Sequence, residues 1–416
     1  MVGGGSTYTP ELVDGFARLD GPTGTVERLT LIDPATDRLA VVGGLARRIF
    51  ARYGHPGTVD WTDDTDAGLT DADVVIIQLR VGGQAARISD ETFPLTCGCV
   101  GQETTGAGGL AKALRTVPVV RDIARRARER AAPGAWIVAF TNPVGIVTRA
   151  LLDDGHRALG LCNVSIGVQR RFATLLSVPP AAVALDHVGL NHLTWTRAAT
   201  VDGRDRLPEL LDSYGADLAE LAAMPVGVLR LTGTLPSYYL RYFYCHDAVV
   251  AEQRDAPTRG EQVAEIEREL LDLYADPTLD RKPELLAQRG GAFYSEAAVG
   301  LLASLHRDDS GRHAVNVRNA GTLPGLPDEA VIEVSCRVGA TGATALPTAP
   351  LQPEQAGLVA HVAGYEELAV AAAVRGGRDL VRRALLAHPL VGQYDRAERL
   401  TDLLLANNSA HLVWAR

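Results

Sequence analysis

Cysteine is scarce in this chain, and long apolar runs are absent. The 416 residues include five cysteines, which form no paired disulfide framework. No stretch approaches the roughly 18 uninterrupted apolar residues of a membrane span, and the first residues lack the charged-then-apolar pattern of a signal peptide. These absences predict a protein of the reducing cytoplasm with no membrane partner.

Net positive charge is also lacking. The formal net charge is −9, so the sequence offers no basic footprint for nucleic acid. An anionic small-molecule substrate would need a local arginine cluster acting against this overall field. The hydrophobic content of 46% and charged content of 22% are ordinary for a soluble globular protein. A chain of this length predicts two domains, or one domain with a large elaboration.

The chain opens on glycines followed by a predicted helix. Residues Thr9 to Glu11 supply an N-cap, a first-turn proline and an acid, so a helix should start near Pro10. A glycine turn before a helix N-terminus is the geometry in which backbone N–H groups receive a pyrophosphate. The strand expected before this turn is reduced to Met1-Val2, which indicates a truncated first strand; the alternative is a flexible glycine-rich terminus. The candidate cofactor-binding residues here are Gly3, Gly5, Ser6 and Thr7.

Strands and helices then alternate. A short strand over residues 26–33 ends in Asp33, where an acid would hold the ribose diol of NAD and repel the extra phosphate of NADP. Capping of the following helix is the other role for Asp33, and the two roles can coexist. A helix over residues 35–53, a strand near 58–61, an apolar strand over 73–80 and another over 135–140 continue the pattern. We therefore predict an α/β fold with a Rossmann-type doubly wound sheet, and ligands at the carboxyl ends of its strands.

Polar residues follow these strands. Arg80 and Arg87 come after the strand at 73–80, and Asn142 comes after the strand at 135–140. Arginine can grip a phosphate or carboxylate with two hydrogen bonds. The alternative for Arg80 and Arg87 is an exposed charge or an ion pair, but their position at a strand end favours ligand binding. Residues 101–109 form a glycine-rich loop that introduces a helix from about Leu110.

Two metal-ligating side chains stand beside amides between Leu159 and Trp195. Cys162 precedes Asn163, and His192 follows Asn191. The spacing is too wide for a zinc knuckle, and two ligands are too few for a closed structural zinc site. The pair suggests an open site that a substrate completes, although a core cysteine and a hydrogen-bonded histidine remain the alternative from the residues alone.

Aromatic residues make up only 5% of the chain, yet several cluster beyond residue 200. Tyr238, Tyr239, Tyr242 and Tyr244 lie in one short segment, either as a core seam or with one phenol facing a site. Arg259 opens a charged amphipathic helix, and residues 290–297 form a turn running into another helix. Residues 331–336 have the pattern of a strand, and the end of the chain is predicted to be helical.

In this order, these segments resemble glycoside hydrolase family 4, particularly its 6-phospho-β-glucosidases. The resemblance covers nearly the whole chain. The segments that carry it are residues 3–12, 80–83, 101–106, 141–143, 160–163, 189–192 and 290–297.

The resemblance implies a sheet like that of lactate and malate dehydrogenases, with a C-terminal α+β catalytic domain. Residues 1–160 would bind NAD, and residues 161–416 would bind metal and substrate and form a homodimer or homotetramer. Cys162 and His192 would hold a divalent metal, commonly Mn²⁺, with sugar oxygens O2 and O3 taking open positions. Arg80, Arg87, Asn142, Asn163, Asn191 and Arg259 would contact the substrate, with Asn163 and Asn191 alternatively orienting the ligands.

The family reaction is an exception to two-carboxylate glycosidase chemistry. Hydride leaves C3 of the sugar for NAD⁺, a base removes the C2 proton, the C1 leaving group is eliminated, and water adds before the steps reverse. The family base is a tyrosine; the spacing to Arg259 favours Tyr239, with Tyr242 in reserve. Arg87, with Arg259 from either the same or a neighbouring subunit, is the expected grip on the 6-phosphate.

The sequence leaves more than one substrate specificity open. Members specific for α-linked phosphoglucosides are expected to carry Asp where this chain has Asn163, so Asn163 favours β-linked substrates and leaves the leaving-group acid unassigned. The alternatives are an α-galactosidase, α-glucuronidase or 6-phospho-α-glucosidase of the same family. Outside the family, Asp186-His187 could serve a 2-hydroxy acid dehydrogenase, and a non-catalytic NAD-binding regulator is a further alternative.

Overall fold

The N-terminal half is the predicted doubly wound sheet. The computed structural model describes residues 1–19, 26–291 and 293–415. Parallel strands β1 (Arg28–Ile32) and β2 (Thr58–Thr62) pair, and β3 (Val74–Ile77), β4 (Trp136–Ala139) and β5 (Ala158–Gly160) form a second parallel set. Val2 forms parallel bridges to both Ile32 and Ile77, so it lies between β1 and β3. The order β2-β1-Val2-β3-β4-β5 is that of a dinucleotide-binding Rossmann sheet.

Met1 and Val2 take the place of a longer first strand. The Ile32 N–H donates to Met1 O at 2.8 Å, the Val2 N–H donates to Ile76 O at 2.8 Å, and the Gln78 N–H donates to Val2 O at 3.0 Å. Both residues are buried. The alternative of a flexible glycine-rich terminus is therefore wrong, because the start of the chain is tied to strands on both sides.

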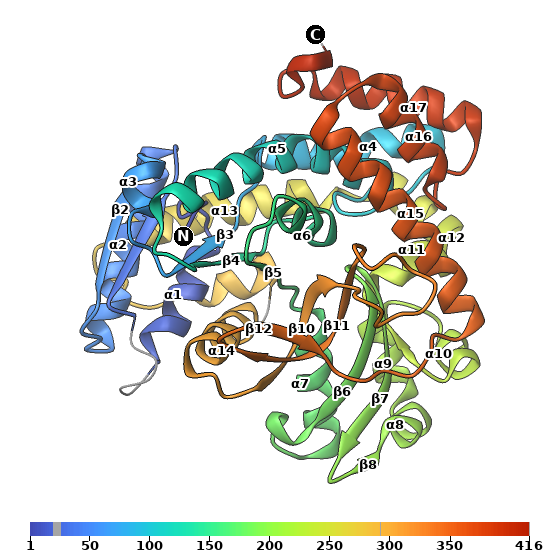
Figure 1. The fold of residues 1–416 in the computed structure, drawn as a ribbon, viewed down its shortest axis with the longest axis horizontal. Coiled ribbons are helices and arrows are strands. Elements are labelled where there is room, and N and C mark those ends of the chain that lie inside the picture. The colour runs from blue at the N-terminus through green and yellow to red at the C-terminus, as the bar shows by residue number, and fades with distance from the viewer. Residues whose placement is uncertain (20–25, 292, 416) are drawn as a thin grey trace.

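Helices cover both faces of this sheet. Figure 1 shows α5 crossing one side of the molecule, and the C-terminal helices gathered at one end of it. Helices α1 and α2 pack together, and α13 and α14 from the second half pack against them, while α5 packs against α4, α6 and α15. The helices of the first half are α1 (Thr9–Ala17), α2 (Thr36–Arg52), α3 (Thr65–Leu69), α4 (Gly83–Thr92), α5 (Gly106–Arg130) and α6 (Val144–Asp153).

The second half is α+β, as predicted. Strand β10 (Gly311–Arg318) pairs antiparallel with β5 and continues the sheet through β11 (Val331–Gly339), β6 (Ala184–Leu190), β7 (Leu193–Val201) and β8 (Arg204–Asp205). Short strands β9 (Leu235–Pro236) and β12 (Gly342–Ala345) pair with β7 and β11. The longer helices are α7 (Val164–Leu176), α12 (His246–Asp255), α13 (Arg259–Ala275), α14 (Tyr294–Arg307), α15 (Pro353–Arg375), α16 (Arg378–Ala387) and α17 (Tyr394–Asn408).

Two local expectations need correction. Helix α5 begins at Gly106 rather than near Leu110, because Gly106 with its φ of +67° starts the helix directly from the loop. The sequence also predicts a strand over residues 186–192, but His192 lies outside it: β6 ends at Leu190, and His192 adopts a left-handed φ of +64° in the turn before β7. His192 lines the main cavity of the fold from this turn.

Helix α15 is long and unusually apolar. Its length and mean hydropathy of 1.3 would allow it to cross a membrane, by composition only. In the fold it packs against α5, α6 and α16. It therefore serves as a packing helix of the second half.

Candidate active site

A cavity of about 1230 Å³ lies where the sequence places ligands. The residues that follow successive strands of the Rossmann sheet all line it, as the doubly wound topology requires. In sheet order they are Asp63 after β2, Asp33 after β1, Gly3 after Val2, Arg80 after β3, Asn142 after β4 and Cys162 after β5. The cavity therefore runs along the carboxyl edge of the whole sheet, a span suited to a dinucleotide and a second ligand.

The glycine turn at one side of the cavity leaves no room for side chains. The N–H groups of Gly3 and Gly4 donate to Ile32 O at 2.9 and 3.0 Å. Gly3 has a φ of +83°, and a Cβ there would lie 2.2 Å from Gln78 O. Gly3, Gly5 and Ser6 line the cavity, ahead of the N-terminus of α1. This cradle fits a pyrophosphate.

Thr7 and Asp33 hold the cradle from two sides. Thr7 is fully buried, and its Oγ1 donates to Glu267 Oε1 at 3.1 Å, so it supports the turn from behind. Asp33 lines the cavity, accepts the Gly5 N–H at Oδ2 (3.1 Å) and accepts the Ala35 N–H at Oδ1 (3.0 Å). One carboxylate thus shapes both the glycine turn and the start of α2, while facing the place of a ribose.

Gly3→Ala is expected to weaken NAD⁺ binding by at least about tenfold. Forcing a Cβ against Gln78 O, in a left-handed conformation that costs about 1–3 kcal/mol, must displace the turn, and about 1.4 kcal/mol corresponds to tenfold in affinity. Isothermal titration with NAD⁺ measures the effect. Gly44→Ala in α2, where a Cβ meets only the flexible Arg48 side chain at 3.4 Å, is the control and should bind NAD⁺ normally.

Cys162 and His192 both face the cavity. Cys162 lies between β5 and α7. Burial and the Glu333 charge raise the pKa of the Cys162 thiol, whereas the nearby backbone N–H groups of Asn163 and Val164 and the amide of Asn191 act in the opposite direction. Burial lowers the pKa of His192 to about 4, so its imidazole is neutral and able to bind a metal.

The orientation of His192 is fixed by Thr104. The Thr104 Oγ1 lies 2.8 Å from His192 Nδ1, which leaves Nε2 as the ring nitrogen for a metal. Among residues 1–19, 26–291 and 293–415, no group of three or more His, Cys, Asp or Glu side chains is placed to hold a metal ion. A thiolate and an imidazole suit a divalent transition metal, with a substrate completing its coordination. The donor set fits the metal that the sequence implies.

Tyr239 lies directly on this pair. Its ring stacks on His192 with centroids 3.5 Å apart and planes at 7°. The other three phenols of the cluster accept structural hydrogen bonds: Tyr238 from Arg241 (2.9 Å), Tyr242 from Gln102 (3.0 Å) and Tyr244 from Trp195 (3.2 Å). Tyr239 is thus the phenol with the position for chemistry.

The ionisation of Tyr239 depends on its surroundings. Burial and the neighbouring Cys162 raise the pKa of the Tyr239 phenol well above its usual range, whereas Arg87 acts in the opposite direction. An added cation beside Cys162 and His192 would favour the phenolate further. A bound metal would therefore convert Tyr239 from a weak acid into a usable base.

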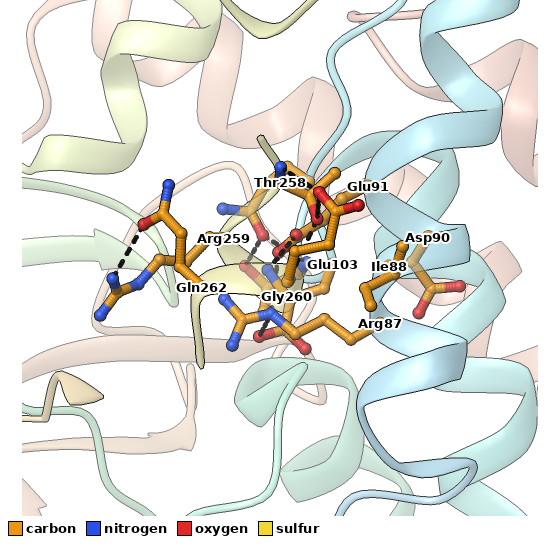
Figure 2. A network of polar contacts seen from close by, with 12 residues as sticks. Arg87, Ile88, Asp90, Glu91, Glu103, Thr258, Arg259, Gly260 and Gln262 are labelled. Atoms are coloured by element: carbon orange, nitrogen blue, oxygen red, sulfur yellow. Dashed lines mark hydrogen bonds and ion pairs between the residues drawn. The ribbon is translucent and has the colours of Figure 1, made fainter. Parts of the chain in front are cut away.

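Basic side chains gather around Glu103 at the cavity wall. Arg80 and Lys112 bond to Glu103 Oε2, the lysine at 2.6 Å, and Arg87 lies 3.2 Å from Glu103 Oε1. Figure 2 shows Arg87 between Glu103 and Glu91, and Glu91 reaching the N-terminus of α13, where its Oε2 accepts the Gly260 N–H at 2.7 Å.

Arg259 joins this cluster from the start of α13. Its guanidinium donates to Gln262 Oε1 (3.1 Å) and Gln288 O (2.6 Å), and it lines the cavity of its own chain. Burial and the nearby Arg87 lower the pKa of Arg259. The cations Arg80, Arg87, Lys112 and Arg259 outnumber the carboxylates Glu91 and Glu103 that pair with them. This excess of positive charge suits an anionic group of a ligand, within a chain that is acidic overall.

The three predicted amides take different positions. Asn142 and Asn163 line the cavity, and Asn142 Oδ1 is buried with no partner within the described part of the chain, so it can receive a ligand hydrogen bond. Asn191 is buried, and its Nδ2 donates to Glu333 Oε2 at 2.8 Å. The arrangement of Asn191 favours ligand orientation over sugar contact.

Asp186 and His187, the pair that a 2-hydroxy acid dehydrogenase would need as its base, bond to different partners. Asp186 Oδ2 bonds to Arg197 at 3.1 Å, whereas His187 Nε2 lies 2.9 Å from Glu333 Oε1, deep in the sheet. Both residues line a separate cavity of about 100 Å³. Asp186 and His187 therefore do not act together as a base at the main cavity.

Several residues of the site were missed from the sequence. Glu103 lies within a glycine-rich segment that carried no assigned role, and Arg289, Glu267 and Tyr294 line the cavity from the second half. Glu333 had a usable signal, because it is an acid flanked by the apolar residues Ile332 and Val334 within a strand. Ala292, in the predicted turn at 290–297, lies outside the described residues.

Family models match most of the chain. The Family 4 glycosyl hydrolase model matches residues 1–178, and the Family 4 glycosyl hydrolase C-terminal domain model matches residues 187–391. The probable 6-phospho-beta-glucosidase of Bacillus subtilis (strain 168) is 36% identical over 426 residues, which cover 99% of this chain and 96% of that protein. The 6-phospho-beta-glucosidase of Escherichia coli (strain K12) is 35% identical, with 98% and 94% covered.

Solved structures agree with these matches. The 6-phospho-beta glucosidase of Thermotoga maritima, solved with NAD and glucose-6-phosphate, has a TM-score of 0.90 at 31% identity and covers 99% of this chain and 98% of its own. The same enzyme was also solved with manganese, NAD⁺ and glucose-6-phosphate. A 6-phospho-alpha-glucosidase from gut microorganisms has a TM-score of 0.90 at 26% identity, with 99% and 97% covered. Malate dehydrogenase from Salinibacter ruber, at 17% identity and a TM-score of 0.54 with 91% and 97% covered, shares the fold alone.

Proposed function

The chain belongs to glycoside hydrolase family 4, and on that basis we propose that it hydrolyses 6-phospho-β-glucosides to glucose 6-phosphate and an aglycone. The proposed enzyme uses NAD⁺ and a divalent metal, with Mn²⁺ the first choice, and acts in the cytoplasm as a homodimer or homotetramer. The Tyr239–His192 stack carries the proposal, because it places a phenol against one of the two metal-ligating side chains.

The cofactor and metal have residues suited to them. Gly3, Gly5, Ser6 and Asp33 would hold NAD⁺ along the cavity, and Cys162 and His192 would hold the metal. When bound, NAD⁺ accepts hydride from C3 of the sugar, and the metal increases the acidity of the proton at C2.

The chain itself supplies the proton transfer. Tyr239 removes the C2 proton through its phenolate oxygen, and its stacking on His192 holds the ring beside the sugar carbons. Arg87 favours the phenolate, since its charge opposes the rise that burial causes in the pKa of Tyr239. Asn142 and Asn163 are placed to bond sugar hydroxyl groups, and Asn142 offers a buried, unpartnered oxygen for this within the described part of the chain.

The basic cluster supports a phosphorylated substrate. Arg87 and Arg259 lie close enough to influence each other, and a phosphate dianion between them would relieve that repulsion with charge-assisted hydrogen bonds. We therefore propose these two arginines as the grip on the 6-phosphate, with Arg80, which pairs with Glu103, as a neighbouring cation.

Two observations favour a β-linked substrate. The residue after Cys162 is Asn163, which cannot donate a carboxylic acid proton as an Asp could. Relatives of 31–36% identity carry the β-specific name, whereas the α-specific structure is 26% identical. An α-linked specificity is the remaining candidate within the family.

One assay tests the proposal. p-Nitrophenyl β-glucoside 6-phosphate should be cleaved only when NAD⁺ and Mn²⁺ are both present, and a chelator should stop the reaction. Arg87→Met should lower kcat/KM about ten- to hundredfold, through the loss of bonds to a charged group. Preferred cleavage of the α-linked analogue would reassign the linkage, equal cleavage of the unphosphorylated glucoside would remove the phosphate grip, and net NADH formation would indicate a dehydrogenase.

A further inference from the structure

Glu333 is a buried acid that the proposed reaction does not use. It lies on β11 and is only 1% exposed. In the sheet it pairs with Asn316 of β10 on one side and Gly189 of β6 on the other. Burying an acid in the middle of a sheet costs free energy, so its neighbours must compensate it.

Three side chains do so. His187 Nε2 lies 2.9 Å from Glu333 Oε1, and the amides of Asn191 and Asn316 donate to Oε2 at 2.8 and 2.9 Å. Burial opposes ionisation, yet these bonds hold the pKa of Glu333 below its usual range. Glu333 is therefore a carboxylate anion in the sheet interior.

The network leads to the metal ligands. Asn191, held by Glu333, immediately precedes His192 in the β6–β7 turn, and its side chain lies near the Cys162 sulfur. One buried anion is thus linked through Asn191 to the turn that carries one ligand and to the surroundings of the other.

We propose that Glu333 is a positioning residue of the metal site: it fixes the Asn191 amide so that this amide donates to the Cys162 thiolate, and it holds the turn that carries His192. The inference rests on the proposed function, since it assumes that Cys162 and His192 bind a divalent metal. A single thiolate leaves a divalent cation with uncompensated positive charge. The Glu333 carboxylate supplies further negative charge in an interior where water cannot screen it.

An amide in place of the carboxylate separates this role from simple packing. Glutamine has nearly the same shape as glutamate, but it lacks the charge, and one of its two oxygens becomes an NH₂ group. Asn191 and Asn316 both donate to Oε2, so Glu333→Gln must either lose these bonds or turn the NH₂ toward His187. In the first case Asn191 would be free to rotate away from Cys162, and in the second the negative charge and the contact with His187 would be lost.

The test measures metal binding with the full chain. Mn²⁺ titration followed by the electron paramagnetic resonance of free Mn²⁺ should show binding to the wild type, and about 10- to 100-fold weaker binding to Glu333→Gln. Co²⁺ serves as a second probe, because the thiolate-to-cobalt charge-transfer band reports the Cys162 bond directly and should weaken in the variant. NAD⁺ affinity should remain unchanged.

Two further variants keep the result decisive. Asn191→Ala removes the link itself and should weaken Mn²⁺ binding even if Glu333→Gln fails to fold. Asp14→Asn removes another buried carboxylate, one bonded to Arg18 and Tyr53 on the cofactor side, and should leave Mn²⁺ affinity unchanged.

The possible results separate this inference from the proposed function. Wild-type affinity in both Glu333→Gln and Asn191→Ala overturns the positioning role alone, and so does an equal loss in Asp14→Asn. A wild-type chain that binds neither Mn²⁺ nor Co²⁺ overturns the metal site together with this inference.

Discussion

Replacing Tyr239 with phenylalanine is expected to lower turnover by about 10²–10⁴-fold, the usual contribution of a positioned proton-transfer group. Phenylalanine retains the ring that stacks on His192 at 3.5 Å, so the metal ligands and the cavity wall should keep their places. Only the oxygen that accepts the C2 proton is lost. The variant should therefore bind NAD⁺ and Mn²⁺ like the wild type.

Isotope exchange separates this loss from a binding defect. In D₂O, the wild type should place deuterium at C2 of the product, whereas Tyr239→Phe should show neither turnover nor exchange. Tyr242→Phe is the matched control: its phenol bonds to Gln102 at 3.0 Å, so its loss should affect local packing more than chemistry. Full turnover in Tyr239→Phe together with a loss in Tyr242→Phe would transfer the role of base to Tyr242.

The fold could be predicted wherever a sequence pattern is compatible with only one kind of structure. The continuous apolar run of β3 would expose hydrophobic side chains to water on a surface, so it predicts a buried strand. The polar residues at its carboxyl end predicted the edge of the sheet where ligands bind. The position of His192 was not predictable, because its left-handed φ depends on how the chain turns from β6 to β7. Met1-Val2 was ambiguous for a similar reason: two residues show no periodicity, and only pairing with Ile32 and Ile77 defines their place.

The residue types of the site could be predicted from the sequence, but the pairing of its acidic and basic side chains could not. The family resemblance, now confirmed, brought together Cys162, His192 and Tyr239 from three distant segments, and the cavity contains all three. A sequence does not show which acids neutralise which bases, so Glu103 and Glu333 escaped notice. The same limitation affected Asn191, for which the sequence left sugar contact and ligand orientation open, and its bond to Glu333 favours the second role.

Asp90→Asn is expected to lower the free energy of unfolding by about 3–5 kcal/mol, the cost of leaving a buried charge without its partner. Arg115 donates to Asp90 Oδ1 and Oδ2 at 3.0 and 2.6 Å, and the two side chains are 2% and 1% exposed. Arg115 also bonds to Asn408 at the end of α17. The pair therefore connects α4, α5 and α17, and urea unfolding followed by circular dichroism measures its loss.

The charge, rather than the contact, should account for most of this effect. The double replacement Asp90→Leu with Arg115→Met fills the space with apolar groups, and it should recover much of the stability lost in Asp90→Asn. A single variant that loses less than about 1 kcal/mol would mean that water reaches Arg115 and that the pair behaves like a surface ion pair.

The location of this pair also predicts an effect on substrate binding. Asp90 shares α4 with Arg87 and Glu91, which lie in the basic cluster at the cavity wall (Figure 2). Loosening α4 should move Arg87 and raise KM for the phosphorylated substrate more than it lowers kcat, because Tyr239 and His192 lie on other elements. The buried ion pair would then stabilise the fold and also hold the proposed phosphate grip in position.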